Sequence, residues 1–207
     1  MDKTRRKMLN TISLGGILTL SGCLDVLRTP RVDYTTDEQI SISIPNVAQN
    51  PDTSHFDLDF NVEIIKRNAD ADGPPVISVS IENTGDSDVI LMGKTRALFG
   101  GEIDTTRSVL LLTNDELNED QIKDTNCWSL KDDIPRSGTD YETTLRGGNQ
   151  SNIELNIIGN ANTDNCIPTG EYRFDTDYAA YLPDDSGNQL VEEFTWGFIL
   201  DILMEDI

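Results

Sequence analysis

The chain has few of the side chains on which common catalytic and zinc centres depend. Its 207 residues include one histidine, His55, and three cysteines, and they lack a Gly-x-Ser-x-Gly motif. A catalytic triad would need His55 as its base, and Ser54 directly beside it rarely places a nucleophile correctly. A zinc site requires more thiols or imidazoles than remain. The sequence therefore disfavours a triad hydrolase, and His55 is expected to be a surface residue before a strand.

Basic residues are also scarce, with 16 Lys and Arg against 37 Asp and Glu. Four of the basic side chains and one acid lie in residues 1–22, so the remainder carries 12 basic and 36 acidic side chains, a net charge of −24. Such self-repulsion is tolerable where the Debye length falls to about 3 Å, near 1 M salt. The absence of a basic patch argues against nucleic acid as a partner.

No long hydrophobic run is present at the N-terminus. Lys3–Lys7 is basic, residues 12–20 are mostly apolar, and Ser21-Gly22 precede Cys23. This order is typical of a cleaved signal peptide, because the apolar part is shorter than the roughly 20 residues that span a bilayer as a helix. The alternative is a buried N-terminal helix in which Cys23 is incidental.

Two short motifs refine this prediction. The segment containing Arg5 and Arg6 resembles a twin-arginine export signal, with Met8 where many such signals carry Phe. Leu20-Ser21-Gly22-Cys23 resembles the lipobox of prokaryotic lipoproteins, which implies lipid attachment at Cys23. Together with the acidic composition, these motifs resemble those of a haloarchaeal lipoprotein. The resemblance implies a signal-peptide helix over residues 1–22, a lipidated tether over 23–37, and a location on the outer face of the cytoplasmic membrane.

Cys127 and Cys166 remain as an even pair in an oxidising compartment, where a disulfide is the default. Closing a loop of about 40 residues would restrict the unfolded chain by roughly 4 kcal/mol in the entropy model. A zinc site is the competing interpretation.

Residues 38–207 show the alternation of β-strands. Apolar residues alternate with polar ones in a series of segments. These segments are Ile40–Ile44, Phe56–Ile64, Ile77–Ile81, Val89–Leu91, Ser108–Leu112, Ile153–Ile157, Tyr172–Leu182 and Phe194–Met204. A helix remains an alternative for Ile199–Leu203. One short helix is predicted over Asp115–Ile122, capped by Asn114. The pattern predicts an all-β sandwich or barrel with one short helical insertion, in which Trp128 and Trp196 belong to the core.

Two further segments carry a resemblance. Ile77–Leu91 with its Asn83-Thr84-Gly85 turn is similar to the early hairpin of prokaryotic immunoglobulin-like domains. Pro168–Phe174 is similar to the start of a late strand of that fold, where a tyrosine forms a corner hydrogen bond. The resemblance implies an immunoglobulin-like β-sandwich over residues 38–207.

Two surface sites are candidates. The first half of a calcium-binding loop is resembled by Asn68, Asp70 and Asp72, which are followed by Gly73. The sequence departs from such a loop in two ways: Val79 occupies the position of the bidentate Glu, and Pro74-Pro75 follow the glycine directly. A plain turn is the alternative, and no other cofactor is indicated. Asn149-Gln150-Ser151 is an N-glycosylation sequon. Paired acids elsewhere are expected in so acidic a chain.

These features favour a non-enzymatic, lipid-anchored surface protein that binds a protein partner or serves as an envelope accessory. One alternative is a solute- or ion-binding lipoprotein of a transport system, whose usual two-lobed α/β body is not seen in the pattern. The second alternative is a secreted hydrolase.

Overall fold

The structure, a computed structural model, describes most of the chain after the predicted tether. The described residues are 38–50, 55–93, 104, 110–114, 116–123, 128–132, 141–161, 167–184 and 187–206.

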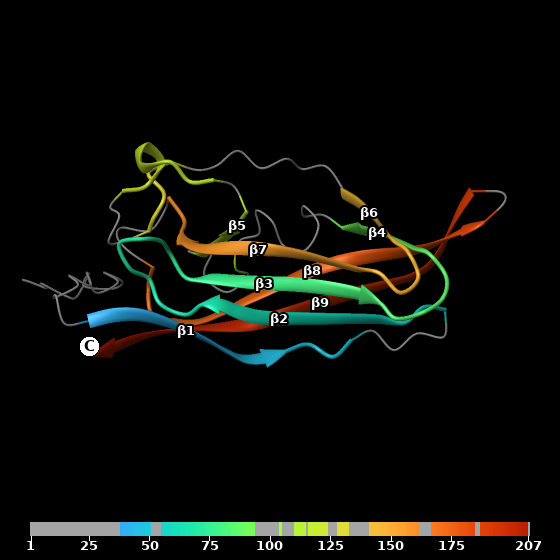
Figure 1. The fold of residues 1–207 in the computed structure, drawn as a ribbon, viewed down its shortest axis with the longest axis horizontal. Helices are drawn as coiled ribbons and strands as arrows, with labels where there is room; N and C mark the ends of the chain where they lie inside the picture. The colour runs from blue at the N-terminus through green and yellow to red at the C-terminus, as the bar shows by residue number, and fades with distance from the viewer. Residues whose placement is uncertain are drawn as a thin grey trace, which may run out of the picture. The chain divides into compact units, whose positions relative to one another are not determined.

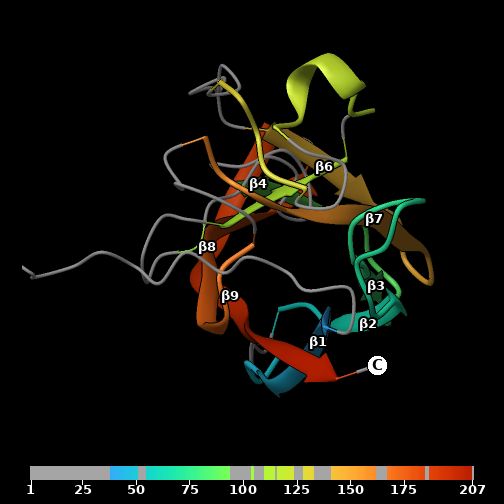
Figure 2. The ribbon, with the colours of Figure 1, turned by 90° about the vertical axis from the view of Figure 1, so that its left-hand side faces the viewer.

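Nearly all of the regular structure consists of strands in two antiparallel sheets (Figures 1 and 2). The five-stranded sheet has the order β1 (Glu38–Val47), β9 (Gly187–Asp206), β8 (Gly170–Asp184), β4 (Val89–Gly93), β6 (Tyr141–Leu145). The four-stranded sheet has the order β2 (Leu58–Lys66), β3 (Val76–Asn83), β7 (Gln150–Gly159), β5 (Leu110–Thr113). The prediction that the domain is built almost entirely of β-strands is confirmed.

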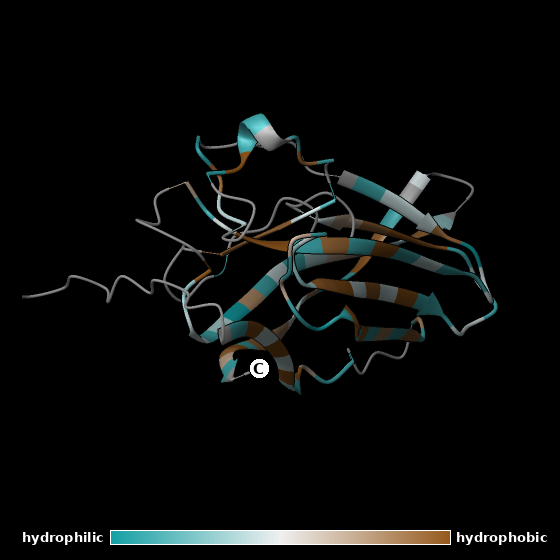
Figure 3. Cartoon of the chain, turned by 60° about the vertical axis from the view of Figure 1, so that its left-hand side comes forward, coloured by the Kyte–Doolittle hydropathy of each residue, from teal (hydrophilic) through white to brown (hydrophobic). Residues whose placement is uncertain are grey.

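The core lies between the inner faces of the two sheets. In β2, buried and exposed positions alternate from Leu58 to Glu63, as predicted from the sequence, and Figure 3 shows the same striping along the strands. Ile77 and Val79 of β3 meet Phe174 and Leu200 of the other sheet in one cluster of buried side chains. Each fully buried side chain of this size contributes about 1.5–3 kcal/mol.

An aromatic group joins the two sheets within this core. Phe60 of β2 stacks on Trp196 of β9, with ring centroids 4.6 Å apart, and lies 5.6 Å from the ring of Tyr178 of β8. Trp196 is buried and its Nε1 donates to the carbonyl of Ala48 at 3.2 Å. The predicted core position of Trp196 is confirmed.

Two buried polar side chains fix the ends of strands. The Tyr172 hydroxyl donates to the carbonyl of Pro168 at 2.8 Å, which is the corner bond expected from the sequence. The Asn83 side chain is fully buried. Its Nδ2 donates to the carbonyls of Ser87 at 2.8 Å and Leu145 at 3.0 Å. Its Oδ1 accepts a hydrogen bond from the Gly85 N–H. Asn83 thereby bonds the end of β3 to the end of β6 in the other sheet.

The predicted helix over Asp115–Ile122 is wrong. Of this segment, residues 116–122 are described, and they contain one 3₁₀ turn, Glu119–Gln121. An isolated helix of this length is unstable without an apolar face to pack. Ile122 instead pairs with Leu130 in a β-bridge and packs beside Leu111 and Ile158 in a small second cluster.

Two other expectations change. Ile199–Leu203 is strand, because β9 pairs with β1 on one side and with β8 on the other, so the helical alternative is wrong.

Strand β6, Tyr141–Leu145, was not predicted. It is an edge strand paired only with β4, and it has too few buried positions to produce an alternating pattern.

Candidate functional site

Several predicted functional residues lie outside the part of the chain that the structure describes. They are the export residues Arg5 and Arg6, the lipid-attachment residue Cys23, and the cysteines Cys127 and Cys166. The lipid anchor and the disulfide therefore stay predictions.

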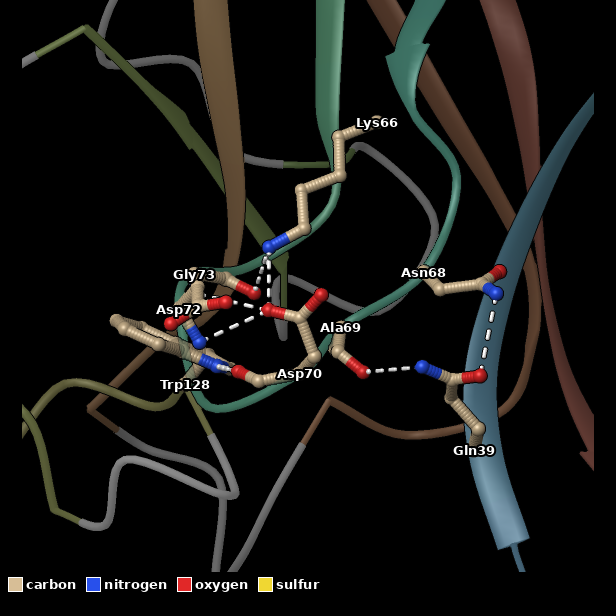
Figure 4. Close-up of polar contacts among 8 residues, drawn as sticks. All are labelled: Gln39, Lys66, Asn68, Ala69, Asp70, Asp72, Gly73 and Trp128. Atoms are coloured by element: carbon tan, nitrogen blue, oxygen red, sulfur yellow. Dashed lines mark hydrogen bonds and ion pairs between the residues drawn. The ribbon is translucent and has the colours of Figure 1, made fainter. Parts of the chain in front are cut away.

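The predicted half-loop for calcium forms a tight turn after β2 (Figure 4). Asp70 Oδ1 accepts hydrogen bonds from the backbone N–H groups of Asp72 at 2.9 Å and Gly73 at 3.1 Å. The Lys66 ammonium lies 2.6 Å from the same oxygen and also donates to the Gly73 carbonyl at 2.8 Å. A lysine charge thus sits among the oxygens of this turn, where the calcium hypothesis places a cation.

Lys66 also changes the acidity of the turn. Its hydrogen bond to the carboxylate is the largest cause that lowers the pKa of Asp70, and the backbone N–H groups of Asp72 and Gly73 add to it. A carboxylate bonded in this way stays ionised and already has its donors. The geometry is that of a turn stabilised by its own side chains.

Asn68 does not converge on this turn. Its Nδ2 donates to the Gln39 side chain at 3.1 Å, and Gln39 in turn donates to the Ala69 carbonyl at 3.1 Å, so Asn68 bonds the loop to β1 (Figure 4). Within the described residues, no group of three or more His, Cys, Asp or Glu side chains is placed to hold a metal ion. The calcium site stays a prediction that this arrangement does not favour.

Trp128 reaches the same turn from a distant part of the chain. Its Nε1 donates to the Asp70 carbonyl at 2.8 Å, and its backbone has φ of 45°, which is uncommon for a residue with a bulky side chain. Its ring is partly buried against the core, as predicted. Trp128 has a structural role here, because it bonds the segment between β5 and β6 to the turn that follows β2.

Two other candidates lie on the surface. His55 is exposed in a bend three residues before β2 begins, in agreement with its predicted position. Asn149 is exposed beside the Gly147-Gly148 turn that precedes β7. Its side chain is accessible to a modifying enzyme, and its glycosylation stays a prediction.

Sequence reasoning missed a groove on the five-stranded sheet. Its volume is about 490 Å³, and it is open to solvent. Its described lining comes from the end of β4, the middle of β8 and the facing part of β9. These residues are Met92, Gly93, Asp177, Tyr178, Ala179, Tyr181, Glu193, Phe194 and Thr195.

The register of the strands explains the hollow. Ala179 of β8 pairs with Met92 of β4 on one side and with Glu193 of β9 on the other. Paired residues share a face of the sheet, so the methyl group of Ala179 lies between the long side chains of Met92 and Glu193. In the next row Asp177 pairs with Thr195, whose hydroxyl donates to Asp177 Oδ1 at 2.6 Å.

The groove combines one aromatic ring with negative charge. Tyr181 is half-buried, whereas Tyr178 and Phe194 pair with each other and stack on the core face of the sheet, with ring centroids 5.4 Å apart. Asp177 and Glu193 are exposed, and none of the described lining residues is basic. The sequence did contain a signal for this groove in the run Asp177-x-Ala179-x-Tyr181. In this run an apolar and an aromatic side chain occupy outward positions of a strand, where polar side chains are expected.

Among the described residues, no helix is long and apolar enough to cross a membrane. Comparison with protein-family models, curated proteins and solved structures finds no match to this chain.

Proposed function

We propose that this chain is an exported, lipid-anchored surface protein whose β domain binds a protein partner without catalysis. The export and anchoring part rests on the sequence motif that ends at Cys23. One acyl chain holds a protein only weakly, so stable retention requires a second chain or added contacts. The domain then stands outside the cytoplasm, on the outer face of the cytoplasmic membrane.

The domain is an immunoglobulin-like sandwich in this proposal. The order β2-β3-β7-β5 matches the A-B-E-D sheet of a constant-type domain, and β9-β8-β4 matches the G-F-C sheet. The Tyr172 corner bond at the start of β8 supports the match, since the fold carries such a tyrosine at the start of strand F. Strands β1 and β6 would then be additions at the two edges of the second sheet.

The groove beside Ala179 is the observation that carries the binding function. Partly exposed aromatic rings with few rotatable bonds are typical of binding surfaces, where they bury large areas at low entropic cost. The groove presents Tyr181 from a strand that is paired on both sides, so its position is fixed before a partner arrives.

Capture from membranes at high salt after mild cross-linking tests this proposal. The wild-type chain is compared with Tyr181→Ala, with Cys23→Ser, and with Ile65→Ala as the matched control. Ile65 is 54% exposed on the other sheet, so its truncation removes apolar surface far from the groove.

A partner that is recovered with wild type and Ile65→Ala, and lost with Tyr181→Ala, supports the proposal. Loss with Cys23→Ser shows in addition that anchoring is required. Equal recovery with Tyr181→Ala and Ile65→Ala would show that the groove is not the binding surface. A soluble small molecule bound in place of a protein would favour the solute-binding alternative, which the groove volume also fits.

A further inference from the structure

We propose that the partner protein adds an extended segment, antiparallel to β9, along the open edge of that strand. This inference rests on the proposed function and names the form in which the partner binds. The added segment presents apolar side chains on the core side and a basic side chain opposite Glu193.

Strand β9 extends well beyond the strand beside it. β1 pairs with residues 198–206 of β9, near the C-terminus (Figure 1). Ala48 then donates to the Gly197 carbonyl at 2.9 Å, and by Asn50 the chain has reached β2 of the other sheet, which the Asn50 side chain bonds. Among the described strands, only β8 pairs with residues 187–197 of β9. This half of β9 therefore has an edge with no strand beside it.

The backbone groups of this edge are arranged for strand addition. The Gly197 carbonyl accepts from Ala48, so it points away from β8. In an antiparallel ladder, residues two positions apart direct their N–H and C=O groups to the same side. Glu193 and Thr195 therefore direct theirs outward, and in the described part of the chain no backbone hydrogen bond joins them to a further segment. Such an edge is a template for an extended peptide, which supplies the missing partners through its main chain.

The two faces beside the edge select the side chains of the added segment. On the core face, Phe194 is only half-buried, although its ring centroid lies 5.9 Å from that of Phe60 and 5.4 Å from that of Tyr178. An apolar side chain of an added strand would cover it. On the outer face Glu193 is exposed, and opposite charges on paired residues contribute about 0.2–1 kcal/mol. The segment therefore alternates apolar and polar residues, with a lysine or arginine opposite Glu193.

A second copy of this chain fits the edge less well. Glu192 and Glu193 lie at the middle of residues 187–197, so antiparallel pairing of two β9 edges would bring the acids of both copies together. Like charges opposite each other are destabilising. The chain after residue 22 also carries 12 basic against 36 acidic side chains, which opposes self-association. The edge thus suits a different protein that supplies positive charge.

Amide hydrogen exchange of the full chain in detergent micelles, read by NMR at constant high salt, tests the inference. In the free chain, bonds to β8 should protect the amides of Phe194 and Trp196, while those of Glu193 and Thr195 exchange freely. The probe is the peptide acetyl-Thr-Val-Lys-Val-Thr-amide, whose lysine lies opposite Glu193 in antiparallel register. At saturation it should slow exchange at Glu193 and Thr195 at least about fivefold, the ratio for one hydrogen bond of about 1 kcal/mol.

Two modified peptides separate main-chain pairing from unspecific contact. N-methylation of the lysine removes the N–H that faces β9, so it should abolish the protection. N-methylation of both valines alters N–H groups that point away from β9, so the protection should remain. Glutamate in place of the lysine should weaken binding, because it repels Glu193.

Two variants of one residue test the same pairing from the protein side. Thr195→Pro removes the outward N–H and leaves the bonds to β8, and proline is tolerated on edge strands. Thr195→Ala is its matched control, because both variants lose the hydroxyl that donates to Asp177. Peptide binding should be lost with Thr195→Pro and kept with Thr195→Ala.

Protection of Glu193 and Thr195 in the free monomer, equal effects of the two N-methylated peptides, or no saturable protection would each overturn strand addition. Protection that grows with protein concentration, together with a dimer mass, would overturn it in favour of a second copy. The proposed function fails separately, since its test is partner capture by Tyr181→Ala against Ile65→Ala. A partner lost with Tyr181→Ala and recovered with Thr195→Pro would retain the binding surface and reject only the added strand.

Discussion

Replacing Asn83 by Ala should destabilise the domain by about 4–6 kcal/mol. The Asn83 side chain makes three hydrogen bonds, to the Ser87 and Leu145 carbonyls and from the Gly85 N–H, and it is fully buried. Each bond contributes about 1 kcal/mol net, and a carbonyl left buried without a donor costs a further 1–3 kcal/mol. Because Asn83 links β3 to the end of β6, the loss affects both sheets at once.

The assay is equilibrium unfolding in denaturant at constant high salt. The midpoint should fall while the slope stays unchanged, which shows a change in stability with no change in the unfolded state. Asn61→Ala is the matched control, since the Asn61 side chain is exposed and donates to the exposed Glu63 at 3.0 Å, and it should shift stability by less than about 0.5 kcal/mol. A loss below about 1 kcal/mol for Asn83→Ala would refute the reasoning.

Three further predictions use the same unfolding measurement. Tyr172→Phe removes only the hydroxyl that donates to Pro168 and should cost about 1 kcal/mol; no loss would remove the corner bond as a stabilising contact. Gly197→Ala should cost more than about 3 kcal/mol, because its Cβ would meet the β8 backbone at 2.1 Å; a loss below about 1 kcal/mol would contradict this packing. Asp70→Asn keeps the turn's acceptor oxygen but loses the charge, so it should cost less than about 1 kcal/mol. Because the pKa of Asp70 is lowered in the folded state, this difference should be full near neutral pH and vanish as pH falls below the ordinary value of 3.8; a difference independent of pH would refute the ion pair with Lys66.

The strands could be predicted from sequence because their two faces meet different surroundings. Phe60 and Val62 face the core while Asp59 and Asn61 face water, so the period of two is explicit in the residues. Edge strand β6 gave no such pattern. The predicted helix failed because Ile122 could be buried by pairing with Leu130 in place of packing from a helix.

The candidate site was harder to predict because it is made by pairing between distant segments. Ala179 forms a floor only because Met92 lies 87 positions earlier in the chain and Glu193 lies 14 positions later, both in register with it. Outward residues of a strand resemble an ordinary wet face until their cross-strand neighbours are known. The turn at Asp70 carried a local signal that could have been used, since Lys66 stands four residues before it.

A photo-reactive residue placed at Tyr181 tests the central claim most directly. It is introduced into the full, anchored chain in cells, and the same residue at Ile65, exposed on the opposite sheet, is the control. The account predicts a discrete cross-linked protein adduct from position 181 that is absent from position 65 and is lost when Ala179→Leu fills the groove. Adducts of equal yield from both positions, or an adduct that persists with Ala179→Leu, would contradict it.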